Sequence, residues 1–133
     1  MYKYEQNSIK LLLCKSVHSK YKWGCLKGGA FENETKEQTA VREFLEESSI
    51  PVNQQWFEAY FQQINDEKDI GIFLVNGKNI KDLDKYFTKD ILKQRYLSSE
   101  NSKVKFFDIE NLPTIKQKQY KIIEDIIEHF EKG

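Results

Sequence analysis

Short apolar runs along the chain have the spacing of β-strands, and polar or glycine-rich residues separate them. Residues 9–17 begin with a continuous apolar run, which is typical of a buried strand. A shorter strand is expected at residues 23–26, ended by two glycines. Two aromatic and β-branched runs, 56–64 and 70–75, enclose five polar residues, so a hairpin is the simplest interpretation. Residues 104–109 predict a further strand.

Two other segments have helical spacing. Thr35 can cap a helix that runs to about Ser49, and Pro51 prevents it from continuing. In residues 115–130 the apolar side chains fall on one face, which predicts an amphipathic helix packed against a sheet. Residues 81–96 carry apolar side chains at irregular helical spacing, so both a helix and a partly ordered insertion remain open.

Composition limits what this chain can be. A length of 133 residues supports one core, so we expect a single α+β domain over residues 1–133 with helices against a mixed sheet. Basic and acidic residues both total 21, so no overall field directs the chain to nucleic acid or an anionic membrane; a local basic groove remains open. Cys14 and Cys25 match no zinc-site spacing. With no signal peptide and no apolar run of membrane-spanning length, we expect a cytoplasmic protein with reduced thiols.

Three carboxylates share one face of the helix predicted at residues 35–49. Glu43, Glu46 and Glu47 are related by three and four positions, so their like charges repel. Mg²⁺ or Mn²⁺ prefers such carboxylate oxygens and would remove the repulsion. The alternative is an acidic face that is simply exposed to solvent.

The acidic face belongs to a longer pattern of fixed spacing. Its members, in order, are Gly28, Glu34, Arg42, Glu43, Phe44, Glu46, Glu47 and Ile50. The pattern resembles the Nudix box: Gly, five residues, Glu, seven residues, then Arg-Glu-apolar-x-Glu-Glu-x-Gly-apolar. Six matched polar and glycine positions would arise by chance in one chain with a probability on the order of 10⁻⁵. Trp23 and Leu26-Lys27-Gly28 also resemble the segment that precedes the box in many family members.

The chain departs from the family pattern at two positions. Ser49 stands where the box has its second glycine, and a left-handed residue there would make Ser49→Gly stabilising by about 1 kcal/mol. Leu26 stands where proline is usual. The first strand of the family would have to form from residues 1–5 alone.

The resemblance implies a Nudix-like α/β/α sandwich and a metal site on the box helix. It implies Glu43 and Glu47 as the principal ligands of Mg²⁺ or Mn²⁺, Glu46 as an assisting ligand, and the main-chain carbonyl of Lys27 as a further ligand. The bound ions would neutralise phosphate oxygens and activate a water molecule. Glu34 and Arg42 resemble the pair that fixes the loop of the box to its helix.

Other site residues are less determined by the resemblance. The general base is a carboxylate of the box helix or a downstream acid, for which Glu100 is the first candidate and Asp66, Glu67 and Asp69 are competitors. The Lys27 ammonium group can contact a substrate phosphate. The aromatic side chains that could stack on a nucleobase are Trp23, Phe57, Tyr60 and Phe61, of which strand alternation allows about half to face a pocket.

The implied activity is hydrolysis of a pyrophosphate bond in a nucleoside diphosphate linked to another group. Leu26-Lys27-Gly28 is more similar to the corresponding segment of dinucleoside-polyphosphate and RNA 5′-end hydrolases than to that of nucleotide-pool sanitising members. The expected partners are therefore a nucleoside polyphosphate or an RNA 5′ end, without a membrane, for a monomer or homodimer. The alternative is a Nudix-fold module that binds nucleotide or RNA without hydrolysis.

Overall fold

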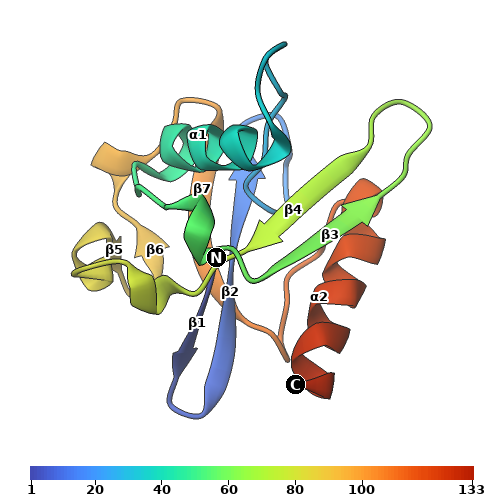
Figure 1. The fold of residues 1–133 in the computed structure, drawn as a ribbon. Coiled ribbons are helices and arrows are strands. Elements are labelled where there is room, and N and C mark those ends of the chain that lie inside the picture. The colour runs from blue at the N-terminus through green and yellow to red at the C-terminus, as the bar shows by residue number, and fades with distance from the viewer.

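Strand β2 lies at the centre of the fold in the computed structural model, which describes residues 1–133 (Figure 1). The strands are β1 (Tyr2–Glu5), β2 (Ser8–Ser16), β3 (Ala59–Gln63), β4 (Ile70–Leu74), β5 (Phe87–Thr88), β6 (Ile91–Leu92) and β7 (Asn101–Asp108). Five of them form one sheet in the order β1-β2-β7-β6-β5, and β3 and β4 form a separate hairpin. Every strand ladder is antiparallel.

Two α-helices lie against this framework. They are α1 (Lys36–Ser48) and α2 (Tyr120–Lys132). Short 3-10 turns lie at Gln54–Trp56, Gly77–Asn79, Leu83–Tyr86, Gln94–Tyr96 and Gln117–Gln119. Figure 1 shows α1 across one end of the sheet and α2 beside the β3-β4 hairpin.

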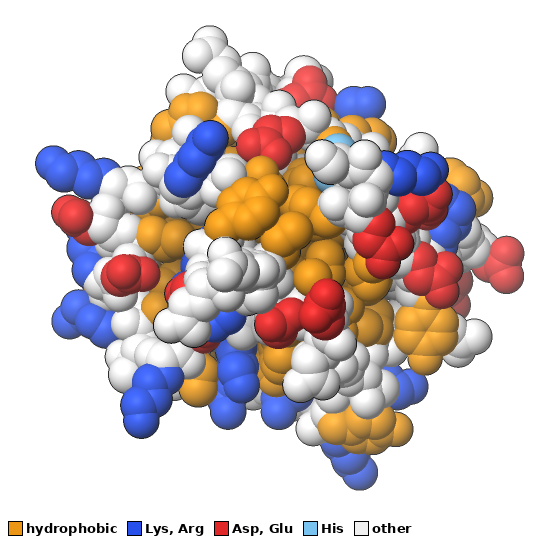
Figure 2. All heavy atoms as spheres, turned by 90° about the horizontal axis from the view of Figure 1, so that it is seen from below, with side chains coloured by type: hydrophobic (Ala, Val, Ile, Leu, Met, Phe, Trp, Pro, Cys, Tyr) orange, Lys and Arg blue, Asp and Glu red, His pale blue; other side chains and the backbone are white.

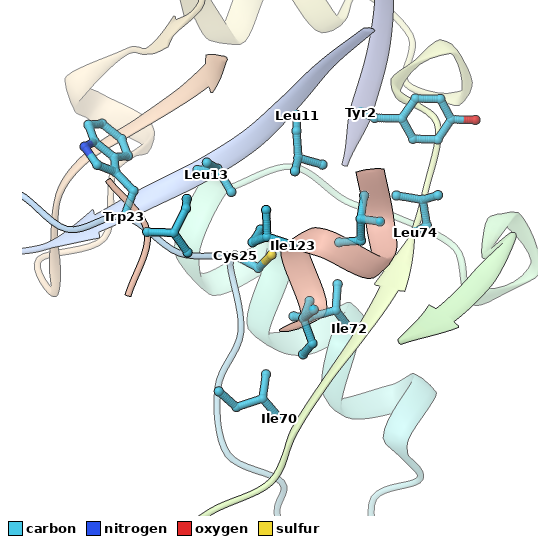
Figure 3. Close-up of a cluster of buried hydrophobic side chains, with 12 residues drawn as sticks. Tyr2, Leu11, Leu13, Trp23, Cys25, Ile70, Ile72, Leu74 and Ile123 are labelled. Atoms are coloured by element: carbon cyan, nitrogen blue, oxygen red, sulfur yellow. The ribbon is translucent and has the colours of Figure 1, made fainter. Parts of the chain in front are cut away.

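Strand β2 is buried on both faces because successive side chains point in opposite directions. Leu11 and Leu13 face a cluster that includes Trp23, β4 and the isoleucines of α2 (Figure 3). Leu12 and Cys14 face a second cluster, which includes Phe44 of α1. The continuous apolar run of the sequence is thus explained by two cores, one under each helix.

These two cores make the fold the α/β/α sandwich expected from the resemblance. The first strand forms from the N-terminal residues, and the central hairpin forms as predicted. The sheet is mostly antiparallel, and parallel pairing is confined to two isolated bridges, Tyr2 with Asn76 and Trp23 with Ile115. Neither helix is long and apolar enough to span a bilayer.

Three local predictions were wrong. Residues 23–26 form only isolated bridges, with Trp23 donating to the Thr114 carbonyl and accepting from Lys116. Because this pairing uses the backbone of residues 114–116, the last helix begins at Tyr120 rather than near residue 115. Residues 81–96 are neither a long helix nor unordered: they form 3-10 turns and the short strands β5 and β6.

The end of the molecule opposite α1 carries no dominant charge. Figure 2 shows apolar side chains at its centre and charged side chains of both signs around them. This mixture agrees with the formal net charge of zero. Both cysteines are free and buried, and burial raises the pKa of Cys14 to about 12 and that of Cys25 to about 11. Neither thiol therefore ionises near neutral pH.

Helix α1 ends at Ser49 in the predicted left-handed conformation, with φ of 65°. The side chain has a role that the sequence did not reveal, because its hydroxyl donates a hydrogen bond of 3.0 Å to the carbonyl of Tyr96. Glycine would relieve left-handed strain worth about 1–2 kcal/mol. It would also lose a bond worth about 0.5–1.5 kcal/mol and add unfolded-state entropy worth about 0.4–1 kcal/mol. We therefore expect Ser49→Gly to be nearly neutral.

Ser49→Ala separates the two effects, because alanine keeps the strain and loses the bond. We expect it to lower the free energy of unfolding by about 1 kcal/mol. Urea denaturation with an unchanged slope measures both variants. A gain in stability for Ser49→Gly comparable to the relieved strain would show that the bond to Tyr96 contributes nothing.

Candidate active site

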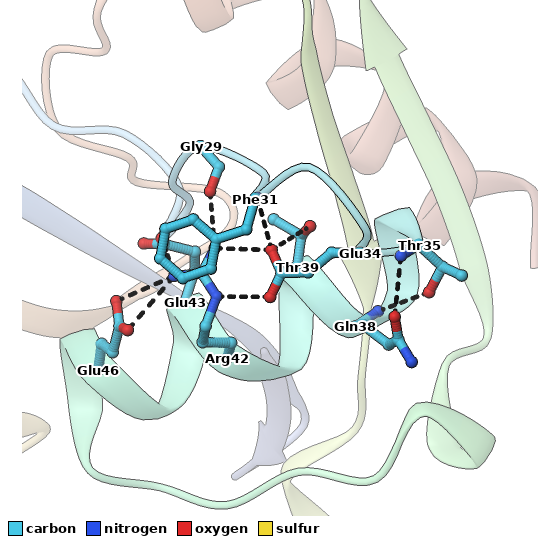
Figure 4. Close-up of polar contacts among 9 residues, drawn as sticks. All are labelled: Gly29, Phe31, Glu34, Thr35, Gln38, Thr39, Arg42, Glu43 and Glu46. Carbon is cyan, nitrogen blue, oxygen red and sulfur yellow. Dashed lines mark hydrogen bonds and ion pairs between the residues drawn. The ribbon is translucent and has the colours of Figure 1, made fainter.

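The box helix α1 is started by a local capping arrangement. The hydroxyl of Thr35 accepts a hydrogen bond from the backbone of Gln38 at 3.1 Å, and the side chain of Gln38 accepts from the backbone of Thr35 at 2.9 Å (Figure 4). This reciprocal pair satisfies backbone donors that the first helical turn leaves free. It fixes where α1 begins and therefore which of its residues face the loop before it.

Arg42 joins that loop to α1. Its guanidinium donates two hydrogen bonds to the Glu34 carboxylate, at 2.6 and 2.9 Å, and one to the carbonyl of Gly29 at 2.7 Å. The ring of Phe31 covers the guanidinium at 3.8 Å (Figure 4). The bonds from Arg42 lower the pKa of Glu34 to about 2, so this pair is ionised at neutral pH. Arg42 and Glu34 are placed to position the loop.

Glu47 is a buried carboxylate without a basic side chain as partner. It is 7% exposed, and its hydrogen bond is with the backbone N–H of Lys27, at 3.1 Å. Burial, and then the nearby Glu43 carboxylate, raises the pKa of Glu47 to about 8. Two acidic groups are thus held close together on the inner face of α1: Glu43, which contacts Arg42, and Glu47, which has no basic side chain as partner.

Glu43 lies directly over Gly28. A Cβ atom at Gly28 would overlap the Glu43 carboxylate, whereas one at Gly29 would meet only the flexible end of Lys68, at 3.2 Å. Neither glycine has a positive φ, so Gly28 is needed for space rather than for backbone conformation. The first glycine of the box therefore makes room for the carboxylate that lies beside Glu47.

Glu46 does not join the inner pair. Its side chain is 55% exposed and lies 3.3 Å from Arg42, which also contacts Glu43 at 2.6 Å. No group of three His, Cys, Asp or Glu side chains is arranged to hold a metal ion. The expected three-carboxylate face is therefore divided into an inner pair, Glu43 and Glu47, and an outer residue, Glu46.

The inner pair fits a divalent cation nevertheless. A buried acid that faces a second acid is costly unless a positive charge compensates it. The main-chain carbonyl of Lys27, close to Glu47, accepts no hydrogen bond and is available as a third oxygen ligand. Oxygen ligands of this kind suit Mg²⁺ or Mn²⁺.

Glu100 lies near this pair although it is distant in sequence. It is exposed in the loop before β7, and its charge contributes to the raised pKa of Glu47. Its carbonyl accepts a hydrogen bond of 3.0 Å from Val17, which fixes the loop to the end of β2. Of the downstream acids considered as a base, Glu100 is the one whose charge reaches Glu47. Asp66, Glu67 and Asp69 belong to the β3-β4 turn, from which Asp69 lines the cavity described below.

The placement of Trp23 contradicts its predicted contact with substrate. The indole is 8% exposed and packs edge-to-face against Phe107 at 4.7 Å, inside the core under α2. A ring enclosed in this way has no free face for a nucleobase. Strand alternation could not reveal this, because residues 23–26 do not form a regular strand.

A cavity of about 280 Å³ lies between α1, the loop before it and the β3-β4 hairpin. Its aromatic wall consists of Phe57, Tyr60 and Phe73; Phe57 is stacked on Phe73 with ring centroids 4.7 Å apart. Phe61 points away from it, toward α2. The sequence identified Phe57 and Tyr60 but missed Phe73, whose pairing with Tyr60 across the hairpin was the available signal.

Charged groups line the same cavity. Glu43 lies on the α1 side, and Lys27, Lys36 and Lys68 supply positive charge. The ammonium of Lys36 lies 4.3 Å from the centre of the Tyr60 ring. The acids of the lining are Glu43 and Asp69, and Glu47 lies behind Glu43 outside it. An aromatic wall with cations and the Glu43 carboxylate at one side can hold a planar ring and bring an attached phosphate to Glu43.

Comparison with known families agrees with this geometry. The model of the NUDIX domain matches residues 4–126, which is most of the chain. The chain belongs to the Nudix family. No curated protein matches it.

Solved structures with this Nudix fold include two hydrolases and one ligand-bound domain. The Ap4A hydrolase of C. elegans, in a binary complex, has a TM-score of 0.64 at 20% identity, with 98% of this chain and 90% of that chain covered. An ADP-ribose pyrophosphatase from Streptococcus suis has a TM-score of 0.59 at 14% identity, covering 96% and 86%. The NUDIX domain of Shewanella oneidensis NrtR, complexed with ADP ribose, has a TM-score of 0.59 at 16% identity, covering 97% and 82%. At these identities the likeness concerns the fold.

Proposed function

We propose that this Nudix protein is a pyrophosphohydrolase that depends on Mg²⁺ or Mn²⁺. Its substrate is a nucleoside diphosphate linked to another group. The observation that carries the proposal is the buried Glu47 carboxylate beside the Glu43 carboxylate, for which Gly28 leaves room. A structural acidic helix would expose these side chains to solvent, whereas Glu47 is enclosed with no basic side chain as partner.

Each part of the site has a role in this chemistry. A divalent cation held by Glu43, Glu47 and the Lys27 carbonyl would neutralise phosphate oxygens and lower the pKa of a bound water. Water attacks one phosphorus, the bridging P–O bond breaks, and a carboxylate takes the water proton. We assign the role of this proton acceptor to Glu100 or to an acid of the box helix. Glu46 assists at the outer side, and Arg42 with Glu34 holds the loop.

The cavity supports a nucleotide as substrate. Phe57, Tyr60 and Phe73 offer stacking surface to a base, and Lys27 offers charge to a phosphate. Among possible substrates we favour dinucleoside polyphosphates and RNA 5′ ends. The fold neighbours named above include an Ap4A hydrolase and a domain complexed with ADP ribose.

One observation favours a second candidate, a module that binds nucleotide without hydrolysis. Arg42 already occupies one oxygen of Glu43, and no three-carboxylate cluster is assembled. The two candidates differ in a direct assay. A panel of dinucleoside polyphosphates, 5′-triphosphorylated and capped RNA, nucleotide sugars and deoxynucleotides, incubated with Mg²⁺ or Mn²⁺, gives cleaved products only for the enzyme. Binding of a nucleotide without turnover of any panel member would establish the module.

We expect divalent metal to raise the thermal stability of the protein, since it binds the native state and relieves repulsion between Glu43 and Glu47. A concentration of about one hundred times the dissociation constant should add roughly 2.7 kcal/mol. The melting temperature across a titration with Mg²⁺ and Mn²⁺ measures this effect. A melting temperature that stays constant throughout would contradict the metal site.

A further inference from the structure

A stripe of four α1 residues forms one wall of the cavity. Glu43 lies at one end of the stripe and Lys36 at the other, with Thr39 and Ala40 between them. These positions differ by three and four residues, so they share one face of the helix. Two helical turns, about 10 Å, separate the charged ends. Because the residues in the middle are short, a ligand can run along the helix from the acidic end to the basic end.

Lys36 marks the aromatic end of this stripe. Its ammonium lies 4.3 Å from the centre of the Tyr60 ring, at the beginning of α1 beside the β3-β4 hairpin (Figure 1). A Cβ atom at Gly71 of β4 would overlap the Tyr60 hydroxyl, so glycine there makes room for the ring. A substrate that extends from Glu43 to the aromatic wall therefore passes Lys36.

A second lysine reaches the cavity from the β3-β4 turn. The ammonium of Lys68 lies close to Gly29, where a Cβ atom would be 3.2 Å from it. The carbonyl of Gly29 accepts a hydrogen bond from Arg42, which also contacts Glu43 (Figure 4). These contacts place Lys68 beside the loop of the box, on the side of the cavity that carries the Glu43 carboxylate.

The turn that carries Lys68 is joined to the segment before α2. The side-chain amide of Asn65 donates hydrogen bonds to the carbonyl of Lys68 at 3.2 Å and to that of Lys118 at 3.3 Å. Glu67 also pairs with Lys118, at 3.2 Å. The backbone of Lys68 is therefore held in place while its side chain extends over the loop of the box.

No acid neutralises Lys36 or Lys68, because neither belongs to an ion pair in the structure. The two acids of the cavity lining have other partners. Glu43 accepts from Arg42, and Asp69 accepts from a backbone N–H of its own turn. The region between Glu43 and the aromatic wall therefore carries unpaired positive charge, which suits an anionic group.

We propose that Lys36 and Lys68 bind a substrate phosphate that lies between the aromatic wall and the cleaved bond. This inference rests on the proposed function and narrows it to substrates with three or more consecutive phosphates, such as dinucleoside polyphosphates. The cleaved bond lies at the Glu43 end, so two phosphates belong there. In a diphosphate-linked nucleotide only the uncharged sugar would lie beside the two ammonium groups. A third phosphate gives them a partner.

The first test measures binding of adenosine, ATP and inorganic tripolyphosphate by calorimetry, with a chelator present so that no divalent metal contributes. We expect ATP to bind at least about tenfold more tightly than adenosine, with an affinity that falls as salt rises. The variant K36Q/K68Q should lose at least about tenfold in affinity for ATP and for tripolyphosphate but bind adenosine like the parent. Loss of adenosine binding as well would point to a disturbed cavity and contradict the phosphate subsite.

The control variant K78Q/K81Q removes the same charge from exposed lysines outside the cavity and should bind all three ligands like the parent. Equal loss of ATP affinity in both variants, or none in either, would overturn the proposal. These measurements need no turnover. A protein that binds as expected but cleaves no nucleotide would contradict the proposed function and leave the phosphate subsite standing.

The second test concerns the length of the phosphate chain and uses turnover with Mg²⁺ or Mn²⁺. K36Q/K68Q should lower kcat/KM for a dinucleoside tetraphosphate at least about tenfold, and that for ADP-ribose much less, because ADP-ribose has no third phosphate. An equal loss for both substrates would show that the two lysines do not select for a longer chain.

Discussion

Replacing Glu47 by Gln is expected to lower turnover at least about a hundredfold while the fold is retained, since changes behind a metal ligand already cost 10–100-fold. Gln keeps the volume of the side chain and its ability to accept from the Lys27 N–H. It removes the charge that would hold the cation. Steady-state kinetics on the best substrate of the panel measures the loss, and a variant with near-full activity would show that Glu47 holds no ion.

Glu46→Gln is the matched control, because it removes the same charge from the outer side of α1. We expect a smaller loss of turnover from it than from Glu47→Gln. Equal losses would show that the division of the acidic face into an inner pair and an outer residue does not extend to the working enzyme.

Glu47→Gln is also expected to change how the stability of the metal-free protein depends on pH. The pKa of Glu47 rises from its ordinary 4.5 to about 8 in the folded chain, so the native state binds this proton more tightly than the unfolded state. The free energy of unfolding should therefore fall as pH rises from about 4.5 to about 8, and the loss is complete above that range. Glu47→Gln should flatten this slope. Denaturation midpoints at pH 5 and pH 9 distinguish a buried acid from an exposed one.

The box and its helix could be predicted from the sequence because their signals are local. Thr35 and Pro51 bound α1, and a spacing of three and four residues places acids on one face whatever the helix packs against. The spacing could not show which of those acids is buried. Packing decides that: Glu47 faces the Lys27 loop, whereas Glu46 is drawn outward to Arg42.

Predictions failed where distant segments determine the local structure. Residues 81–96 lack a regular pattern because their short strands are held by the main sheet, with Asp90 bound to Lys3 and Lys10. Trp23 was expected to contact substrate. The sequence could not show that it is buried, because its burial depends on packing against the distant Phe107. The proximity of Lys15 and Lys103 had no signal in the sequence, because strand pairing alone brings them together.

Gly28→Ala is expected to lower turnover by about 10–100-fold, the range seen when the groups supporting a metal ligand are disturbed. The new Cβ would overlap the Glu43 carboxylate and force it away from Glu47. The backbone at Gly28 does not have a positive φ, so alanine causes no strain there. The displaced group is the end of a flexible side chain, and the unfolding midpoint should change little.

Gly29→Ala is the matched control for Gly28→Ala. It makes the same substitution one residue later, where the Cβ would meet only the movable end of Lys68, and activity should stay within a few-fold of the parent. The two variants share backbone freedom, local sequence and added volume, so a difference between them reports the location of Glu43. Similar activity for both would mean that the Glu43 carboxylate works from another position than the one above Gly28. A large loss for Gly29→Ala would instead implicate the Gly29 carbonyl, which accepts from Arg42, in holding the loop.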